Sequence, residues 1–373
     1  MEPVIRIGFD ARWFNDSGVG SYIASLLEAL GEMNDEEFEV VVYENPGNPV
    51  PVDSPRLRKQ LVRAAKYSPA EQIELAYRCW RDRIDVFHAP FYVVPLFAPC
   101  PVISTIHDLM AFLFPLYGPL HQKVVQAGYR AAAWKSKRMI AVSQATVQDL
   151  VSILDVPSEK IRLVYNGYAK TKYHTNGVPH EPAYLRDRYG ILGPYALTLS
   201  ASNWRTKNLD GAMRALALAE QDSSVPFQSV IAGPKNGYLA SGLAGTIKNE
   251  IVTGFVPKED LPKLYRNASV FLSVSRYEGF GIPLMEAMGC GCPTIASTGG
   301  SLPEIAGDAA PVFDCEDVRG IANEVIRLFA DAEYREQRRV RGLQRADEFS
   351  YTKCARETLQ LYRETAARAR GGL

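Results

Sequence analysis

The sequence predicts an α/β protein made of two doubly wound domains in tandem. Short apolar segments of continuous hydrophobicity alternate with segments of helical periodicity, a pattern typical of parallel sheets covered by helices on both faces. The pattern stops between about residues 169 and 190, which are rich in polar residues, proline, glycine and histidine, and then resumes. A length of 373 residues also exceeds what one ordinary hydrophobic core needs.

The first half of the chain supplies the strands of one predicted sheet. The opening apolar run, Val4–Phe9, is followed by a turn with two glycines and by a helical pattern over 21–30. Ser143 is suited to cap a helix that begins at Gln144. Further strands are predicted at 40–43, 85–88, 102–106, 139–142 and 161–165.

The second half repeats the alternation, with helices predicted at 209–219 and 261–266. We therefore expect an N-terminal domain over 1–175 and a C-terminal domain over 190–349, with ligands at the carboxyl ends of strands, in the cleft between them. The segment after Phe349 has the pattern of an amphipathic helix, and periodicity leaves its packing partner open. The predicted strands of this half are 195–199, 229–232, 251–252, 270–274 and 293–296.

Composition excludes several classes of protein. A formal net charge of zero argues against a nucleic-acid binder, which needs an excess of lysine and arginine. Six scattered cysteines form no disulfide framework, and we expect a reducing cytoplasm. The N-terminus lacks the pattern of a signal peptide, and prolines interrupt the most apolar stretch, 91–103, so we expect no membrane-spanning helix.

The sequence also shows no sign of metal or covalent catalysis. It contains no Asp-x-Asp, and its histidines lack metal-ligand spacing, so we expect neither a metal nor another cofactor to be required. No Ser-His-Asp or Cys-His arrangement indicates hydrolysis through a covalent nucleophile.

Candidate chemistry is densest between Glu278 and Glu286. A predicted strand ends near Ser275, the loop carries Glu278, and Pro283 suits the first turn of a helix that holds Glu286. Glycines at 279 and 281 let main-chain N–H groups approach an anion, and a carboxylate can accept hydrogen bonds from sugar hydroxyls. Spacing alone leaves open a surface acid followed by an acid near a helix start.

This stretch, Glu-Gly-Phe-Gly-Ile-Pro-Leu-Met-Glu, resembles the Glu-x7-Glu signature of retaining GT-B glycosyltransferases, particularly family 4. The resemblance implies the GT-B fold, two Rossmann-like doubly wound domains that face each other across a cleft. It implies that Glu278 contacts hydroxyls of the transferred sugar and Glu286 the ribose of the nucleotide. The main-chain N–H groups of Phe280 and Gly281 would lie against sugar and phosphate.

Segments in the first half extend the resemblance. Ser17–Tyr22, with Gly18 and Gly20, is similar to the glycine-rich loop that lies over the donor phosphates, although a plain strand-to-helix turn has the same pattern. In Thr105–Leu109 the family places a histidine near the donor sugar, here His107. A lone histidine is more often structural, but its position beside Asp108 at the end of a strand favours function.

Segments in the second half belong to the same pattern. Arg205–Leu209 resembles the basic element that binds the diphosphate, where Lys207 would stabilise the leaving group. Family members often carry an arginine several residues earlier; 201–203 is Ala-Ser-Asn here, which leaves Arg205 as a substitute or as a surface residue. Gly233 and Val256 match segments that approach the nucleotide, the latter near the base. The family also implies that the helix over 350–373 packs back on the N-terminal domain.

A basic segment lies between Arg56 and Arg83, with eight basic and three acidic residues. Leu57, Leu61 and Ala65 recur at helical spacing, which is consistent with a helix on an anionic bilayer as well as with a solvated helix face. The chain is thus expected in the cytoplasm, either free or peripheral on the inner face of the membrane through 56–83.

The resemblance implies a retaining hexosyltransferase of polysaccharide or glycoconjugate synthesis. Asp10-Ala11-Arg12 and the context of His107 most resemble mannosyltransferases that use GDP-mannose, with a saccharide or polyprenyl-linked saccharide as acceptor. Two alternatives remain, a GT-B sugar-nucleotide epimerase and a non-catalytic dinucleotide-binding module. The latter is disfavoured because Ile23 stands where Gly-x-Gly-x-x-Gly needs its third glycine.

Overall fold

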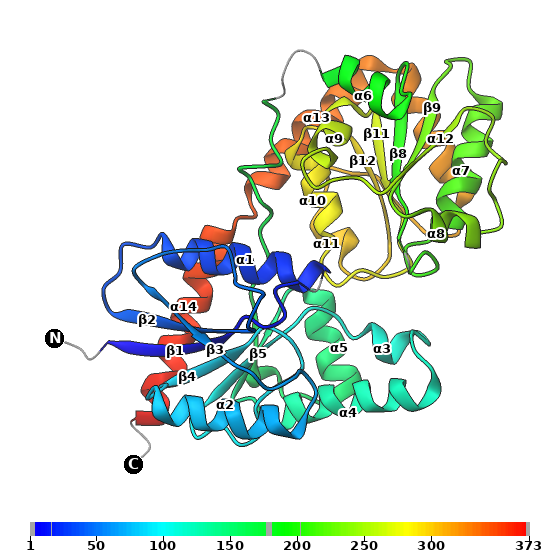
Figure 1. Cartoon of the computed structure of the whole chain (residues 1–373). Helices are drawn as coiled ribbons and strands as arrows, with labels where there is room; N and C mark the ends of the chain where they lie inside the picture. The colour runs from blue at the N-terminus through cyan, green and yellow to red at the C-terminus, as the bar shows by residue number, and fades with distance from the viewer. Residues whose placement is uncertain (1–3, 16, 177–180, 202, 371–373) are drawn as a thin grey trace. The chain divides into compact units, whose positions relative to one another are not determined.

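The computed structural model describes residues 4–15, 17–176, 181–201 and 203–370. The chain divides into two compact units, and the first is discontinuous in sequence (Figure 1). Met1–Gly167 and Ser350–Leu373 form the first unit, and Tyr168–Phe349 forms the second. Both units are α/β layers around a parallel sheet, which confirms the predicted fold class.

The first unit contains a parallel sheet of seven strands in the order β3-β2-β1-β4-β5-β6-β7. The chain moves outward from β1 in one direction and then in the other, which places the topological switch point between β1 and β4. The strands are β1 (Ile5–Asp10), β2 (Phe38–Glu44), β3 (Leu57–Leu61), β4 (Val86–Ala89), β5 (Val102–Ile106), β6 (Arg138–Ala141) and β7 (Ile161–Leu163).

Helices cover both faces of this sheet (Figure 1). On one face α1 (Ser17–Gly31) and α14 (Tyr351–Arg370) pack together and share a core with β1 and β4. On the other face α2 (Pro69–Arg81), α4 (Pro119–Lys135) and α5 (Gln144–Leu154) bury a second core. A short α3 (Met110–Leu113) and a 3-10 turn (Ser158–Lys160) complete the unit.

Local sequence explains where the helices of this second face begin. The hydroxyl of Ser68 accepts a hydrogen bond from the main-chain N–H of Glu71, and Pro69 occupies the first turn of α2. Ser143 caps α5 in the same way by accepting from the N–H of Thr146, as its position before Gln144 predicts. These caps satisfy N–H groups that have no partner within their helix.

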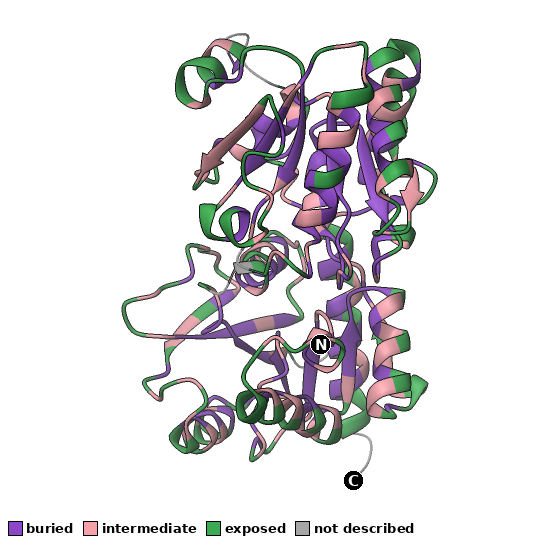
Figure 2. Ribbon diagram, turned by 90° about the vertical axis from the view of Figure 1, so that its right-hand side faces the viewer, coloured by how far each residue is buried: buried purple, intermediate pink, exposed green. Residues whose placement is uncertain are grey.

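The second unit contains a parallel sheet of six strands in the order β10-β9-β8-β11-β12-β13, with its switch point between β8 and β11. The strands in Figure 2 are largely buried, while the helices are exposed along one side. The strands are β8 (Tyr195–Leu199), β9 (Gln228–Ala232), β10 (Glu250–Gly254), β11 (Val270–Ser273), β12 (Thr294–Ser297) and β13 (Val312–Phe313).

Helices α7 (Leu209–Asp222) and α12 (Val318–Ala330) pack on each other over one core of this unit, and α10 (Ile282–Gly289) contacts β11 and β12. The remaining helices are α6 (Glu181–Tyr189), α8 (Lys235–Ala240), α9 (Leu261–Asn267), α11 (Leu302–Ala306) and α13 (Ala332–Asp347). No helix in the described part of the chain combines the length and apolarity needed to cross a bilayer.

Three local expectations need correction. The helix predicted around Leu57, Leu61 and Ala65 is instead the edge strand β3, which pairs with β2 in parallel register. The helix expected over 21–30 begins at Ser17. The polar stretch 169–190, expected as a linker, belongs to the second unit and contains α6, which is held by the ion pair of buried Glu181 with Arg266 at 2.5 Å.

Candidate active site

The switch point of the second unit brings together two residues from loops that follow neighbouring strands. Lys207 follows β8 and Glu278 follows β11. The ammonium of Lys207 donates to Glu278 Oε1 at 2.6 Å, and the hydroxyl of Ser275 donates to the same oxygen at 2.7 Å. A cation and a carboxylate therefore meet at the sheet edge where doubly wound domains bind ligands.

The loop that carries Lys207 is held rigidly against its neighbours. Asn208 has a left-handed backbone with φ of 53°, and its amide donates to the carbonyls of Val274 at 3.0 Å and Cys315 at 2.7 Å. The main-chain N–H of Arg276 donates to the carbonyl of Thr206 at 2.8 Å. Hydrogen bonds at Thr206 and at Asn208 thus fix the backbone on both sides of Lys207.

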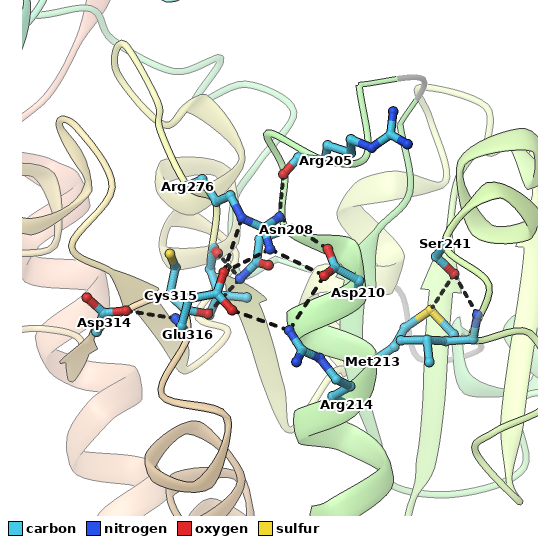
Figure 3. A network of polar contacts seen from close by, with 12 residues as sticks. Arg205, Asn208, Asp210, Met213, Arg214, Ser241, Arg276, Asp314, Cys315 and Glu316 are labelled. Atoms are coloured by element: carbon cyan, nitrogen blue, oxygen red, sulfur yellow. Dashed lines mark hydrogen bonds and ion pairs between the residues drawn. The ribbon is translucent and has the colours of Figure 1, made fainter. Parts of the chain in front are cut away.

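Arg276 forms the centre of a charged network behind this loop (Figure 3). Its guanidinium pairs with Asp210 at 3.2 Å and Glu316 at 2.8 Å, and donates to the carbonyl of Arg205 at 2.6 Å. Burial alone would raise the pKa of Asp210, but the hydrogen bonds and charge of Arg276 hold it below its usual value. Spacing did not reveal this network, because its members lie on three separate segments.

Arg205 itself does not join the ion pairs of this network. Its exposed guanidinium lies 4.8 Å from the centre of the Trp204 ring, and Figure 3 shows it pointing away from Arg276. A role as the second cation for the diphosphate stays a prediction.

Two glycines shape the loop around Glu278. Gly281 caps α10 with φ of 90°, and a Cβ there would lie 2.8 Å from Leu302. Gly300 has φ of 61°, and a Cβ would lie 2.3 Å from the carbonyl oxygen of Glu278. That oxygen accepts from the N–H and hydroxyl of Ser301 at 3.0 and 3.1 Å, so the turn after β12 fixes the backbone of Glu278.

Glu286 lies on α10, half-buried, in an unusual protonation state. Burial raises the pKa of its carboxyl to about 8, although a hydrogen bond from Tyr173 and the charge of Lys172 both act to lower it. At neutral pH the acid is therefore largely protonated. Tyr173 and Lys172 lie in the stretch expected as a linker, where no periodic signal marked them as part of a site.

Gly233, which the family resemblance places near the nucleotide, meets Gly254 at the carboxyl ends of β9 and β10. Gly233 donates its N–H to the carbonyl of Gly254 at 3.0 Å, and both have positive φ, 127° and 72°. A Cβ on Gly233 would lie 2.3 Å from the carbonyl oxygen of Ser200. Val256, two residues after β10, is half-buried. The side chain of Phe280 is buried and meets the Phe349 ring edge-on, with centroids 5.9 Å apart.

His107 follows β5 in the first unit, and its ring is neutral. Burial lowers its pKa to about 4, while its Nε2 is hydrogen-bonded to the carbonyl of Pro90 at 2.9 Å. Because a carbonyl only accepts, Nε2 carries the proton and Nδ1 keeps its lone pair. The ring meets Tyr22 edge-on, with centroids 4.9 Å apart.

Gly18 and Gly20 lie within the first turn of α1 rather than in a loop before it. A Cβ on Gly18 would meet nothing within 4 Å, whereas one on Gly20 would lie 1.9 Å from the carbonyl oxygen of Phe14. Only Gly20 is therefore required by the packing of the chain itself. Within the described residues, no group of three or more histidine, cysteine or acidic side chains is arranged to hold a metal.

Known proteins resemble this chain in sequence and in fold. The family model described as Glycosyltransferase Family 4 matches residues 17–171, and the model described as Glycosyl transferases group 1 matches residues 186–345. O-antigen chain mannosyltransferase B from Escherichia coli is 29% identical over 320 residues, covering 82% of this chain and 81% of that protein.

One further relative and one solved structure are also similar to this chain. The serotype-specific mannosyltransferase WbdA from Escherichia coli is 25% identical over 284 residues, 72% of this chain but 34% of WbdA, so the chain spans about a third of that protein. The solved sucrose-phosphate synthase from Thermosynechococcus elongatus superposes with a TM-score of 0.77 at 20% identity, covering 97% of this chain and 99% of that one.

The fold is GT-B, and the family models and the similar mannosyltransferases identify the chain as a glycosyltransferase. The chain belongs to glycosyltransferase family 4.

Proposed function

We propose that this glycosyltransferase is a retaining mannosyltransferase that transfers mannose from GDP-mannose to a saccharide or polyprenyl-linked saccharide at the inner face of the membrane. The ion pair of Lys207 with Glu278 carries the proposal, because a cation suited to a diphosphate and a carboxylate able to accept hydrogen bonds from sugar hydroxyls meet at one switch point. The similarity to two mannosyltransferases supports mannose as the transferred sugar.

Donor binding would separate Lys207 from Glu278, because each side chain would bind a different part of the donor. Lys207 would turn to the diphosphate, and Glu278 would accept hydrogen bonds from sugar hydroxyls, with Ser275 still orienting its Oε1. Phe280 and Gly281 would direct main-chain N–H groups at the same anion from the start of α10. Charge on the leaving group is then balanced without a metal ion.

Transfer would proceed on one face of the sugar. The bond from the anomeric carbon to the diphosphate oxygen breaks, the bond to the acceptor oxygen forms on the same side, and the departing phosphate takes the acceptor's proton. His107 would accept a hydrogen bond from a sugar hydroxyl at Nδ1, because its pKa of about 4 keeps the ring neutral. Glu286 would bind the ribose, with Gly233 and Val256 on the nucleotide side.

A donor panel tests the proposal. Purified protein is incubated with GDP-mannose, UDP-glucose or ADP-glucose, and its unfolding temperature is measured with and without EDTA. We expect GDP-mannose to stabilise the protein most, by about 2.7 kcal/mol at a hundred times its Kd, and EDTA to change nothing. Stabilisation by a UDP-sugar alone would contradict the choice of donor, and NMR of the product's anomeric proton tests retention.

The comparisons do not favour an epimerase. Such an enzyme would release or rearrange the sugar nucleotide with no acceptor present, so product analysis without acceptor separates the two activities.

A further inference from the structure

The outer sides of α2 and α4 carry an unusual concentration of apolar side chains. On α2, Ile73, Tyr77 and Trp80 are 68%, 54% and 69% exposed, at the i, i+4, i+7 spacing of one helix face. Their helix already buries Leu75 and Cys79 on the opposite side. A helix that is apolar on both sides has a second face with no partner in the described chain.

Helix α4 repeats this arrangement. Leu120, Val124 and Trp134 are 79%, 60% and 75% exposed and lie on one stripe, while Val125 and Tyr129 face the core. Scattered exposed apolar residues are ordinary, but two aligned stripes with two exposed tryptophans indicate a binding surface.

Both stripes point away from the same face of the first sheet. The two helices share one core cluster and lie along one side of the sheet in Figure 1. The segment that contains Leu96, Phe97 and Ala98 contacts both helices. Gln72 of α2 accepts from the N–H of Leu96 at 2.7 Å, and Lys135 of α4 donates to the carbonyl of Ala98 at 3.0 Å. Phe97, on this segment, is 69% exposed.

The charges around these stripes are basic. α4 contains no aspartate or glutamate, and its Lys123 and Arg130 are exposed. The carboxylates of α2 are neutralised by the chain itself, since Glu71 is buried against Arg12, and Glu74 accepts from Arg78 and two main-chain N–H groups.

The cations of the earlier part of the basic segment are occupied. Arg58 pairs with Glu39 at 2.9 Å and Lys59 with Asp53 at 2.6 Å, both on or beside the edge strand β3 rather than on a helix. Residues 57–61 form a strand and not a helix, so within the expected segment 56–83 the candidate membrane surface lies on α2, further along the chain.

We propose that the α2–α4 surface, formed by Ile73, Tyr77, Trp80, Leu120, Val124 and Trp134, binds an anionic lipid bilayer. Tryptophan and tyrosine suit the boundary between headgroups and acyl chains, and the surrounding cations attract anionic headgroups. A second copy of the chain fits less well, because a symmetric contact would set Lys123 and Arg130 against each other. The inference rests on the proposed function only where it concerns a lipid-linked acceptor.

Vesicle sedimentation without donor or acceptor tests the surface independently of the reaction. The protein is mixed with vesicles of phosphatidylcholine, with and without phosphatidylglycerol. We expect binding to the anionic vesicles, weakened by salt, and a loss of about tenfold or more in the partition coefficient for Trp80→Ser with Trp134→Ser. Lys123→Glu with Arg130→Glu should weaken binding to anionic vesicles only.

The matched control changes two exposed leucines of the second unit, Leu192→Ser with Leu239→Ser, and should bind like the wild type. Unchanged circular dichroism and unfolding temperature show that each variant is folded. Vesicle binding that survives both tryptophan changes, or a wild type that binds no vesicles, overturns the proposal. So does a wild-type dimer that the tryptophan variant converts to a monomer without any effect on lipid binding.

Discussion

Tyr362 on α14 is hydrogen-bonded to Nδ1 of His88 on β4 at 2.5 Å, although the two residues are 274 positions apart in the chain. The other ring nitrogen of His88 meets the hydroxyl of Thr105 at 2.7 Å, and that hydroxyl lies 3.1 Å from the hydroxyl of Tyr22. Tyr22 in turn packs edge-on against His107. A buried polar chain thus joins α14 to the neighbourhood of the candidate catalytic histidine.

Removing the Tyr362 hydroxyl should destabilise the protein. Tyr362→Phe leaves a buried nitrogen of His88 without its partner, at a cost of about 1–3 kcal/mol. The free energy of unfolding by urea measures the loss, with Tyr77→Phe, whose side chain is exposed, as the control. An equal, near-zero effect of both changes would show that the hydrogen bond contributes nothing to stability.

Glu278→Ala should lower sugar transfer by about a hundredfold or more, because the sugar hydroxyls and Lys207 lose a shared partner. Nucleotide binding, followed by calorimetry with GDP, should largely survive. Glu316→Gln is the control, since this exposed acid pairs with Arg276 behind the site. Near-normal turnover in Glu278→Ala would contradict the proposal that Glu278 binds the transferred sugar.

The raised pKa of Glu286 predicts that the protein loses stability as pH rises. Its carboxyl keeps its proton in the folded protein up to a pKa of about 8, whereas the unfolded chain releases it near 4.5. The folded state therefore binds more protons between these values, and its stability falls as pH rises through them. The unfolding free energy should fall by roughly 1–3 kcal/mol more in the wild type than in Glu286→Gln between about pH 5 and 8.

His88 and His107 change the stability of the protein with pH in the opposite direction and serve as an internal check. The lowered pKa values of His88 and His107, to about 3 and 4, make stability fall as pH drops below the ordinary value of 6.5. Both the wild type and Glu286→Gln contain them, so the difference between the two proteins cancels this contribution. Identical pH curves would mean that Glu286 ionises normally.

Alanine at Gly18 and Gly20 should have different consequences. Gly18→Ala finds open space in a helix and should leave stability unchanged or raise it by up to about 1 kcal/mol. Gly20→Ala forces a clash with the main chain at Phe14 and should destabilise by about 2 kcal/mol or more. Thermal unfolding compares them, and equal stabilities would contradict the packing described for α1.

Gly18→Ala also tests the role of this glycine toward the donor. A stable variant with weakened GDP-mannose binding would support close approach of a phosphate at this position. Unchanged binding would assign Gly18 to the helix alone.

The sequence identified the parallel sheets because buried parallel strands are continuously apolar, as in 102–106 and 195–199. It missed β3, whose Leu57 and Leu61 are equally compatible with a helix, because an edge strand is only partly buried. The start of α1 was also misplaced, because glycine is a poor helix former and here serves close packing instead.

The candidate site could be predicted where its residues lie close in sequence and not where folding assembles them. Glu278 and Glu286 share one strand-loop-helix segment, so their spacing was informative. The pairing of Lys207 with Glu278 depends on strand order, and the pKa of Glu286 depends on burial beside Tyr173. Neither spatial relationship leaves a periodic pattern in the sequence.

The place of α14 sets an order for folding during synthesis. Ala355, Leu359 and Tyr362 complete the core that α1 and β1 begin, so the first unit lacks part of its interior until the ribosome has released α14. The second unit, Tyr168–Phe349, is continuous and is fully synthesised earlier. We therefore expect the usual order, in which the N-terminal domain matures first, to be reversed, with the second unit completing its fold before the first.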